Sequence, residues 1–166
     1  MLDSGHKHRR DDDYNAPMGV QLDDDYVPTN EGVGYVVMLV ESKATLQNAV
    51  RERLKSRGYR VLVISDPNRA LSRFTPEEDP PADCVIFSAS ELGNLALEAF
   101  NRFASDEHTC SIPSILLADK RQSHIIQAAR RGANRKLLAL PLKVRELRAA
   151  LMQLLSGVER REIGTY

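Results

Sequence analysis

The sequence has only two cysteines, no long apolar run and a formal net charge of zero, and these absences exclude several classes of protein. Cys84 and Cys110 do not make a disulfide framework or a zinc site, so the cytoplasm is the expected location. No apolar run approaches the roughly 20 residues that cross a bilayer, and no apolar stretch follows the basic residues of the N-terminus. We therefore expect neither a membrane segment nor a secretory signal.

The charges are unevenly distributed along the chain, although they sum to zero. This asymmetry indicates either an acidic tail that masks a basic face or ordinary solvated surfaces, and the second interpretation is the simpler. Acidic residues cluster early, at Asp11, Asp12, Asp13, Asp23, Asp24 and Asp25. Basic residues cluster late, at Lys120, Arg121, Arg130, Arg131, Arg135, Lys136, Lys143, Arg145 and Arg148.

The first 34 residues differ in composition from the rest of the chain. They combine Gly, Pro, Asn and two Asp triplets without an apolar period, which predicts a disordered acidic tail or linker over residues 1–34. His6 and His8 lie in this segment, but two histidines on such a tail hold a metal poorly. We expect one folded domain over residues 35–156 and a C-terminal tail over residues 157–166.

Within that domain, apolar runs predict five strands. The run Tyr35–Val40 is rich in valine, as expected for a parallel strand that is buried on both faces. The other runs are shorter and recur at regular intervals. The predicted strands are Tyr35–Val40, Val61–Ile64, Cys84–Phe87, Ile115–Leu117 and Lys136–Leu140.

A helical pattern follows each predicted strand. Gly58 occupies the position where the first helix ends, Asp66 and Pro67 begin the second as N-cap and first residue, and Ser123 is the expected cap of the fourth. Alternating strands and helices predict an α/β fold, a three-layer, doubly wound, five-stranded parallel sheet with helices on both faces. The expected helices cover residues 46–54, 67–74, 92–103, 123–132 and 143–155.

In such a sheet, ligands bind outside the carboxyl ends of the strands. Any active site is therefore expected among the residues that end the strands. These are Glu41, Ser42, Ser65, Asp66, Ser88, Ala118, Asp119, Leu140 and Pro141.

Several segments resemble bacterial response-regulator receiver domains of the CheY-like superfamily. VVMLVESKATLQNAVRERLKSRGYRVLVISDPNRAL resembles their opening, ADCVIFSASELG their third strand and phosphorylation loop, and IPSILLADK their fourth strand. HIIQAARRGANRKLLALPLKVRELRAAL is similar to their final third, including the proline after the fifth strand. The resemblance covers Tyr35 to Leu155 and implies a flavodoxin-like (βα)5 fold and a role in two-component signal transduction.

The resemblance also implies five chemically important positions. In the family, an acidic pair and an aspartate hold Mg²⁺, the aspartate accepts the phosphoryl group, and a hydroxyl residue and a lysine bind its oxygens. Here these positions match Glu41 with Ser42, then Ser88, Ala118 and Leu140. One carboxylate is a poor substitute for three, and the lysine charge is lost. We therefore expect a pseudo-receiver with no catalysis, cofactor or metal.

Alternatives remain open for the acceptor position. Ser88 is a candidate phosphoryl acceptor in an atypical phosphorelay receiver, but a serine that caps the next helix is the simpler interpretation. Asp119 lies one residue past Ala118 and is a candidate to restore some charge if the register slips by one, and Lys120 or Lys143 is a candidate replacement for the missing lysine.

The basic final third predicts a contact surface, because in receivers this part of the fold meets partners. We expect a protein partner and leave self-association open. A nucleic-acid adaptor is the second alternative, and the sequence pI of about 6.9 disfavours it. The candidate partner-binding residues are Arg130, Arg131, Arg135, Lys136, Lys143, Arg145 and Arg148.

Overall fold

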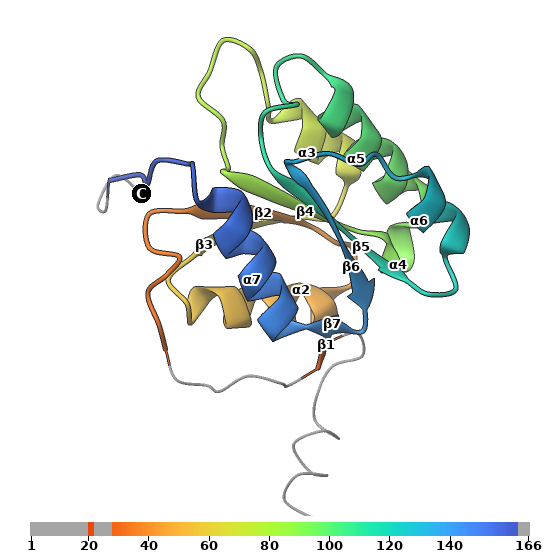
Figure 1. Cartoon of the computed structure of the whole chain (residues 1–166), viewed down its shortest axis with the longest axis horizontal. Helices are drawn as coiled ribbons and strands as arrows, with labels where there is room; N and C mark the ends of the chain where they lie inside the picture. Colours follow the sequence, from red (N-terminus) through yellow and green to blue (C-terminus); the bar gives the residue numbers. More distant parts are fainter. Residues whose placement is uncertain (1–19, 22–27, 163–166) are drawn as a thin grey trace, which may run out of the picture.

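A computed structural model describes residues 20–21 and 28–162 of the chain (Figure 1). Five parallel strands form one sheet in the order β3-β2-β4-β5-β6. The doubly wound α/β fold predicted from the sequence is thereby confirmed. The strands are β2 (Val36–Val40), β3 (Arg60–Ile64), β4 (Cys84–Ser88), β5 (Ser114–Asp119) and β6 (Arg135–Leu140).

Helices cover both faces of this sheet (Figure 1). One face packs against α2 and α7, and the other packs against α3, α5 and α6. The fold therefore has three layers with two separate cores. The helices are α2 (Ala44–Lys55), α3 (Pro67–Ser72), α4 (Ala89–Leu92), α5 (Asn94–Ser105), α6 (Ser123–Ala128) and α7 (Val144–Leu155).

The central strand β2 supplies both cores. Val37 and Leu39 face the layer of α2 and α7, whereas Met38 and Val40 face the layer of α3 and α5. Successive side chains of a strand point to opposite faces, so a strand that is covered on both faces must be apolar throughout. Burial on both faces therefore explains why the segment Tyr35–Val40 is apolar throughout.

Two helices differ from the sequence prediction. The single helix expected over residues 92–103 is preceded by the short α4, and Gly93, with a φ of 53°, separates α4 from α5. Glycine adopts a positive φ readily, so the chain changes direction there. Ser123 is the first residue of α6 rather than its cap, and α6 ends at Ala128 instead of residue 132. By contrast, Asp66 accepts a hydrogen bond from the Asn68 N–H, which confirms the predicted cap of α3.

The folded unit extends beyond the predicted boundaries at 35 and 156. The Gly32 N–H donates to the Arg57 carbonyl at 2.7 Å, and the Arg161 N–H donates to the Gly34 carbonyl at 2.8 Å. The Tyr35 hydroxyl donates to the Val158 carbonyl at 2.8 Å. These hydrogen bonds need no apolar period, which is why the sequence pattern did not predict them. Residues 1–19, 22–27 and 163–166, with both Asp triplets, lie outside the described residues.

A short additional pairing joins the N-terminal segment to the domain. Strand β1 (Val20–Gln21) pairs in parallel with β7 (Leu142–Lys143), which directly precedes α7. The sequence predicted neither strand, because two residues are too few to show a period.

The longest helices have 12 residues, and none in the described part of the chain is long and apolar enough to cross a bilayer.

Candidate functional site

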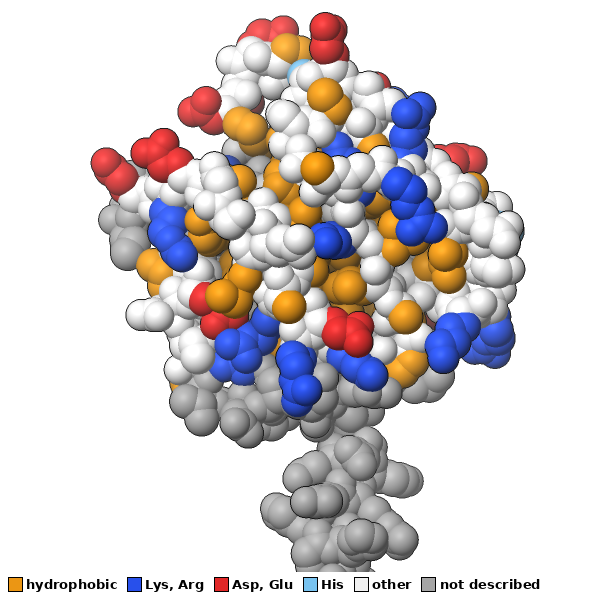
Figure 2. Space-filling view, in the orientation of Figure 1, with side chains coloured by type: hydrophobic (Ala, Val, Ile, Leu, Met, Phe, Trp, Pro, Cys, Tyr) orange, Lys and Arg blue, Asp and Glu red, His pale blue; other side chains and the backbone are white. Residues whose placement is uncertain are grey.

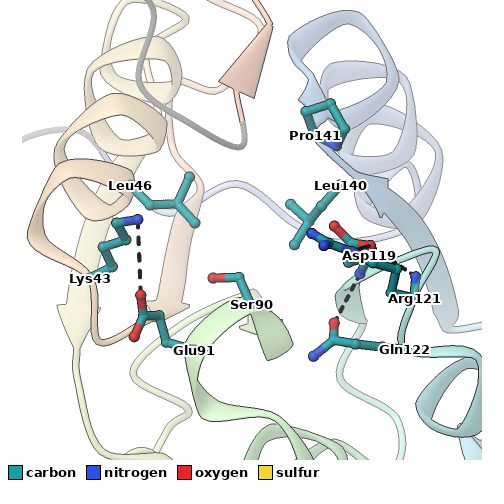
Figure 3. Close-up of a pocket in the computed structure, with 9 residues that line it drawn as sticks. All are labelled: Lys43, Leu46, Ser90, Glu91, Asp119, Arg121, Gln122, Leu140 and Pro141. Atoms are coloured by element: carbon teal, nitrogen blue, oxygen red, sulfur yellow. Dashed lines mark hydrogen bonds and ion pairs between the residues drawn. The ribbon is translucent and has the colours of Figure 1, made fainter.

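The carboxyl ends of the strands surround an open cavity of about 620 Å³ (Figure 3). The first turn of α2, the short α4 and the loops after β5 and β6 form its walls. This is the edge of the sheet at which the fold predicts a ligand site. The lining residues are Lys43, Leu46, Ser90, Glu91, Asp119, Arg121, Gln122, Leu140 and Pro141.

Next to this cavity, Glu41 lies directly after β2 with a side chain that is completely buried. Its Oε1 accepts hydrogen bonds from the hydroxyls of Ser88 and Ser90, each at 2.9 Å. Its Oε2 accepts from the backbone N–H groups of Ser42 at 2.7 Å and Lys43 at 3.4 Å. All four donors are uncharged, and together they engage both carboxylate oxygens.

Ser88 ends β4 beside Glu41 and is also completely buried. It occupies the N-cap position of α4, but its side chain makes no capping hydrogen bond and donates to Glu41 instead. The interpretation of Ser88 as a helix cap was therefore wrong. The hydroxyl donates to a charged acceptor, and hydrogen bonds to charged groups are the strong ones.

Of the other three positions that match the receiver motif, Ser42 is exposed, and Ala118 and Leu140 are apolar and buried. Ala118 near the end of β5 belongs to the core between the sheet and α5. Leu140 at the end of β6 is 6 % exposed, belongs to the core beneath α2 and α7, and lines the cavity. Neither side chain offers a polar group to a phosphoryl oxygen.

Of the three charged residues predicted as substitutes, Lys120 is exposed, and Asp119 and Lys143 are engaged elsewhere. Asp119 accepts from the Arg121 N–H at 2.9 Å and pairs with the Arg121 guanidinium at 3.3 Å. The backbone and side-chain hydrogen bonds from Arg121 hold the pKa of Asp119 below its usual value. Lys143 pairs with Glu146 at 4.0 Å. Within residues 28–162, the hydrogen bonds to the Glu41 carboxylate come from Ser42, Lys43, Ser88 and Ser90, and not from Asp119 or Lys143.

The residues at this edge do not fit a magnesium ion. Mg²⁺ requires near-octahedral oxygen ligands, usually including one or two carboxylates with free lone pairs. Both oxygens of Glu41 accept hydrogen bonds, and serines, Ser42 and Ser88, occupy the positions of the second acidic residue and the acceptor aspartate of the family. Across residues 20–21 and 28–162, no three His, Cys, Asp or Glu side chains gather as a metal site would need.

Two of the predicted partner-binding residues have structural roles. Arg135 is only 7 % exposed, and its guanidinium donates to the carbonyls of Ile112 at 2.6 Å, Asn134 at 2.9 Å and Cys110 at 2.7 Å. Burial lowers the pKa of Arg135 from its usual value. The prediction of Arg135 as a contact residue was therefore wrong.

Arg148 is the second of these residues. Its guanidinium donates to both oxygens of Glu31, each at 2.8 Å, and this pair ties the segment before β2 to α7. The hydrogen bond from Arg148 is the main cause of a lowered pKa at Glu31. The Arg148 side chain stays 26 % exposed, so its contact with a partner remains a prediction.

The five remaining basic candidates are spread along β6, with Lys136 within the strand. Arg130 and Arg131 follow α6 near the amino end of β6, whereas Lys143 and Arg145 follow its carboxyl end. A six-residue strand separates the two groups by about 17 Å. Figure 2 shows Lys and Arg side chains scattered over the visible face with acidic side chains among them.

Among the lining residues that sequence reasoning missed, two take part in the hydrogen bonds of the site. Ser90 donates to Glu41, and Gln122 links the two walls by accepting from the Asp119 N–H and donating to the Ala89 carbonyl. Ser90 lies two residues beyond Ser88, and this spacing after a buried strand was the signal available in the sequence.

Solved structures share this architecture over most of their length. The receiver domain of a sensor histidine kinase from Pseudomonas aeruginosa, with a magnesium ion coordinated in its active-site cleft, has a TM-score of 0.61 and 23% identity, over 75% of this chain and 99% of that one. The receiver domain of a signal-transduction histidine kinase from Syntrophus aciditrophicus has a TM-score of 0.61 and 22% identity, over 80% and 98%. The chemotaxis protein CheY4 from Vibrio cholerae has a TM-score of 0.57 and 17% identity, over 73% and 98%.

The chain has the CheY-like fold. The strand order β3-β2-β4-β5-β6 is the 2-1-3-4-5 order of that fold. A scan of the sequence against protein-family models and a search of curated proteins each found no match.

Proposed function

We propose that this chain is a receiver-type signal-transduction module that works through protein–protein contact and accepts no phosphoryl group at its CheY-like site. The main support for this proposal is the set of hydrogen bonds that the Glu41 carboxylate accepts. Its two oxygens are bound by the hydroxyls of Ser88 and Ser90 and by two backbone N–H groups, where a phosphorylatable receiver binds a metal ion.

Two further features support it. The position of the acceptor carboxylate is Ser88, whose hydroxyl is not ionised and is completely buried, so it lacks a nucleophile's exposure. The position of the lysine is the buried Leu140, so this strand end supplies no positive charge to a transferred group. A module of this kind has no catalytic activity of its own, and its state depends on binding.

Intact-mass spectrometry after incubation with Mg²⁺ and acetyl phosphate tests this proposal. The wild type, Ser88→Ala and a phosphorylatable receiver domain are treated in parallel. We expect the mass increase of one phosphoryl group on the control receiver alone. An adduct on the wild type that is absent from Ser88→Ala would contradict the proposal and identify Ser88 as the acceptor.

A further inference from the structure

The cavity at the carboxyl edge has the size of a small-molecule site. Its volume of about 620 Å³ lies within the roughly 300–1,000 Å³ of ligand pockets in proteins. It also lies beside the boundary between β2 and β4, where the following helices α2 and α5 pass to opposite faces of the sheet. In open α/β sheets, ligands bind at this switch point.

Apolar side chains from two elements form opposite walls. Figure 3 shows Leu46 of α2 and Leu140 of β6 pointing toward one another across the cavity, with Pro141 beside Leu140. Both leucines belong to the core beneath α2 and α7, which fixes their positions. Leu46 is 2 % and Leu140 6 % exposed, so the apolar surface that they offer to an organic molecule is small and is extended by the exposed Pro141.

Two polar groups of the lining have hydrogen-bonding capacity left. The Ser90 hydroxyl donates its proton to Glu41, so its oxygen lone pairs remain as acceptors. The Gln122 amide donates one N–H to the Ala89 carbonyl and retains a second N–H. A ligand group that both donates and accepts, such as an amide or a hydroxyl, matches this pair.

The charges that line the cavity cancel one another. Lys43 pairs with Glu91 at 3.9 Å, and Arg121 pairs with Asp119 at 3.3 Å. With two cations, two anions and the Glu41 carboxylate nearby, this lining does not attract an anion. The complementary ligand is uncharged.

We propose that this cavity binds an uncharged amphipathic small molecule, with its apolar body between Leu46 and Leu140 and a hydrogen-bonding group at Ser90 and Gln122. The inference rests on the proposed function, because it assigns to an organic ligand the place that metal and phosphoryl group occupy in a phosphorylatable receiver.

A fluorescence titration with the uncharged naphthalene ketone prodan tests the site on the full chain, because its carbonyl can accept from the second N–H of Gln122 while its ring occupies the apolar part. The chain lacks tryptophan, so the emission reports on the probe alone. We expect saturable binding with a blue-shifted emission. Leu140→Lys should weaken binding about tenfold or more, because a buried ammonium opposes an apolar ligand. Leu95→Lys, the same change at a leucine that is 57 % exposed on α5, should change it by less than about twofold.

Nuclear Overhauser contacts between wild-type methyl groups and the naphthalene ring decide the question if Leu140→Lys fails to fold. Contacts to Leu46 and Leu140 support the proposal. Absence of saturable binding, contacts elsewhere, or equal weakening by Leu95→Lys would overturn it. Tighter binding of the anionic 8-anilinonaphthalene-1-sulfonate at the same methyl groups would overturn the uncharged class of ligand.

The two proposals fail in distinguishable ways. Phosphorylation is measured by mass on the probe-free protein, whereas binding is measured without acetyl phosphate. A phosphoryl adduct together with probe binding would refute the proposed function alone. Failure of the probe to bind, without any adduct, would refute the ligand site alone.

Discussion

At the amino end of the sheet, charged side chains bind one another and the backbone, whereas at the carboxyl end the buried Glu41 carboxylate is bound by uncharged donors. Asp83, before β4, accepts from the Val36 N–H at 2.8 Å and pairs with Arg161 at 3.2 Å. Arg135, at the start of β6, donates to three carbonyls. Glu41 instead accepts from two serine hydroxyls and two backbone N–H groups.

This difference explains why the charge pattern of the sequence was a poor guide to function. The arginines that lie late in the sequence include residues that hold loops and chain ends in place at the amino end. At the carboxyl end, where a receiver of this fold has its chemistry, the buried Glu41 carboxylate is bound by uncharged donors, and the ion pairs Lys43–Glu91 and Arg121–Asp119 line the cavity. The number of arginines in a segment therefore does not predict the charge of the nearby surface. Arg135 and Arg148, for example, bind carbonyls and a carboxylate of distant segments, which the local sequence does not indicate.

Replacing Glu41 with leucine is expected to have the largest effect. Four buried or partly buried donors would lose their acceptor, which should lower the free energy of unfolding by about 4 kcal/mol. Glu41→Gln is the matched control and should cost about 1 kcal/mol, because its amide oxygen can accept from the backbone while the serine hydroxyls accept from its NH₂ group. Urea unfolding measures both. Equal stability of the two variants would contradict the hydrogen-bond network described for Glu41.

Replacing Arg135 with methionine tests the amino end. The carbonyls of Cys110, Ile112 and Asn134 would lose a charged donor, and we expect a loss of about 3 kcal/mol. Arg130→Met changes an exposed arginine five residues earlier and serves as the control, with little expected effect. If both variants unfold at the same urea concentration, Arg135 is not the structural residue that its burial indicates.

The Glu31–Arg148 pair should give a smaller effect that depends on pH. The pKa of Glu31 is lowered in the folded state from its usual value of 4.5, chiefly by the hydrogen bond from Arg148. Its contribution is therefore complete above pH 4.5 and is lost as the pH falls through the folded pKa. We expect Glu31→Gln to be less stable than the wild type by about 1 kcal/mol at pH 7, with a gap that closes in acid.

Glu77→Gln, in the exposed loop between α3 and β4, is the control for this titration. The free energy of unfolding of this variant should equal that of the wild type at every pH of the titration. A gap between the wild type and Glu31→Gln that stays constant down to pH 3 would show that ionisation of Glu31 does not stabilise the fold.

Arg121→Ala should have the smallest effect. The Arg121 side chain is 91 % exposed, and the variant keeps the backbone N–H that is the first cause of the lowered pKa of Asp119. We expect the urea midpoint to remain within error of the wild type, because exposed ion pairs contribute little. A clear loss of stability would mean that the cavity wall depends on this pair more than its exposure suggests.

The sequence predicted the parts of the fold that depend on local pattern. Apolar runs identified all five strands of the main sheet, and Asp66 with Pro67 identified the start of α3. The split at Gly93 and the short pairing of β1 with β7 were missed, because one glycine or two residues leave no period. The segment 29–34 was missed because it is held by hydrogen bonds and the Glu31 ion pair.

The position of the candidate site was predictable from the sequence, but its hydrogen bonds were not. Glu41 and Ser88 end neighbouring parallel strands, so fold logic alone places them together. That the serine hydroxyl donates to the carboxylate, and that Ser90 joins it, depends on the geometry of α4. The burial of Arg135 depends on carbonyls up to 25 residues away, which no local pattern encodes.

The most direct test of this account is a titration of the chain with Mg²⁺, followed by the backbone amide signals of Ser42, Lys43 and Ser88 in ¹H–¹⁵N NMR spectra. Ser42 and Lys43 donate these N–H groups to Glu41, so they report on any change at its carboxylate. We predict that their shifts follow only the general effect of ionic strength, as do those of exposed amides. Saturable shifts confined to these residues would show that the site binds the metal and would contradict the account.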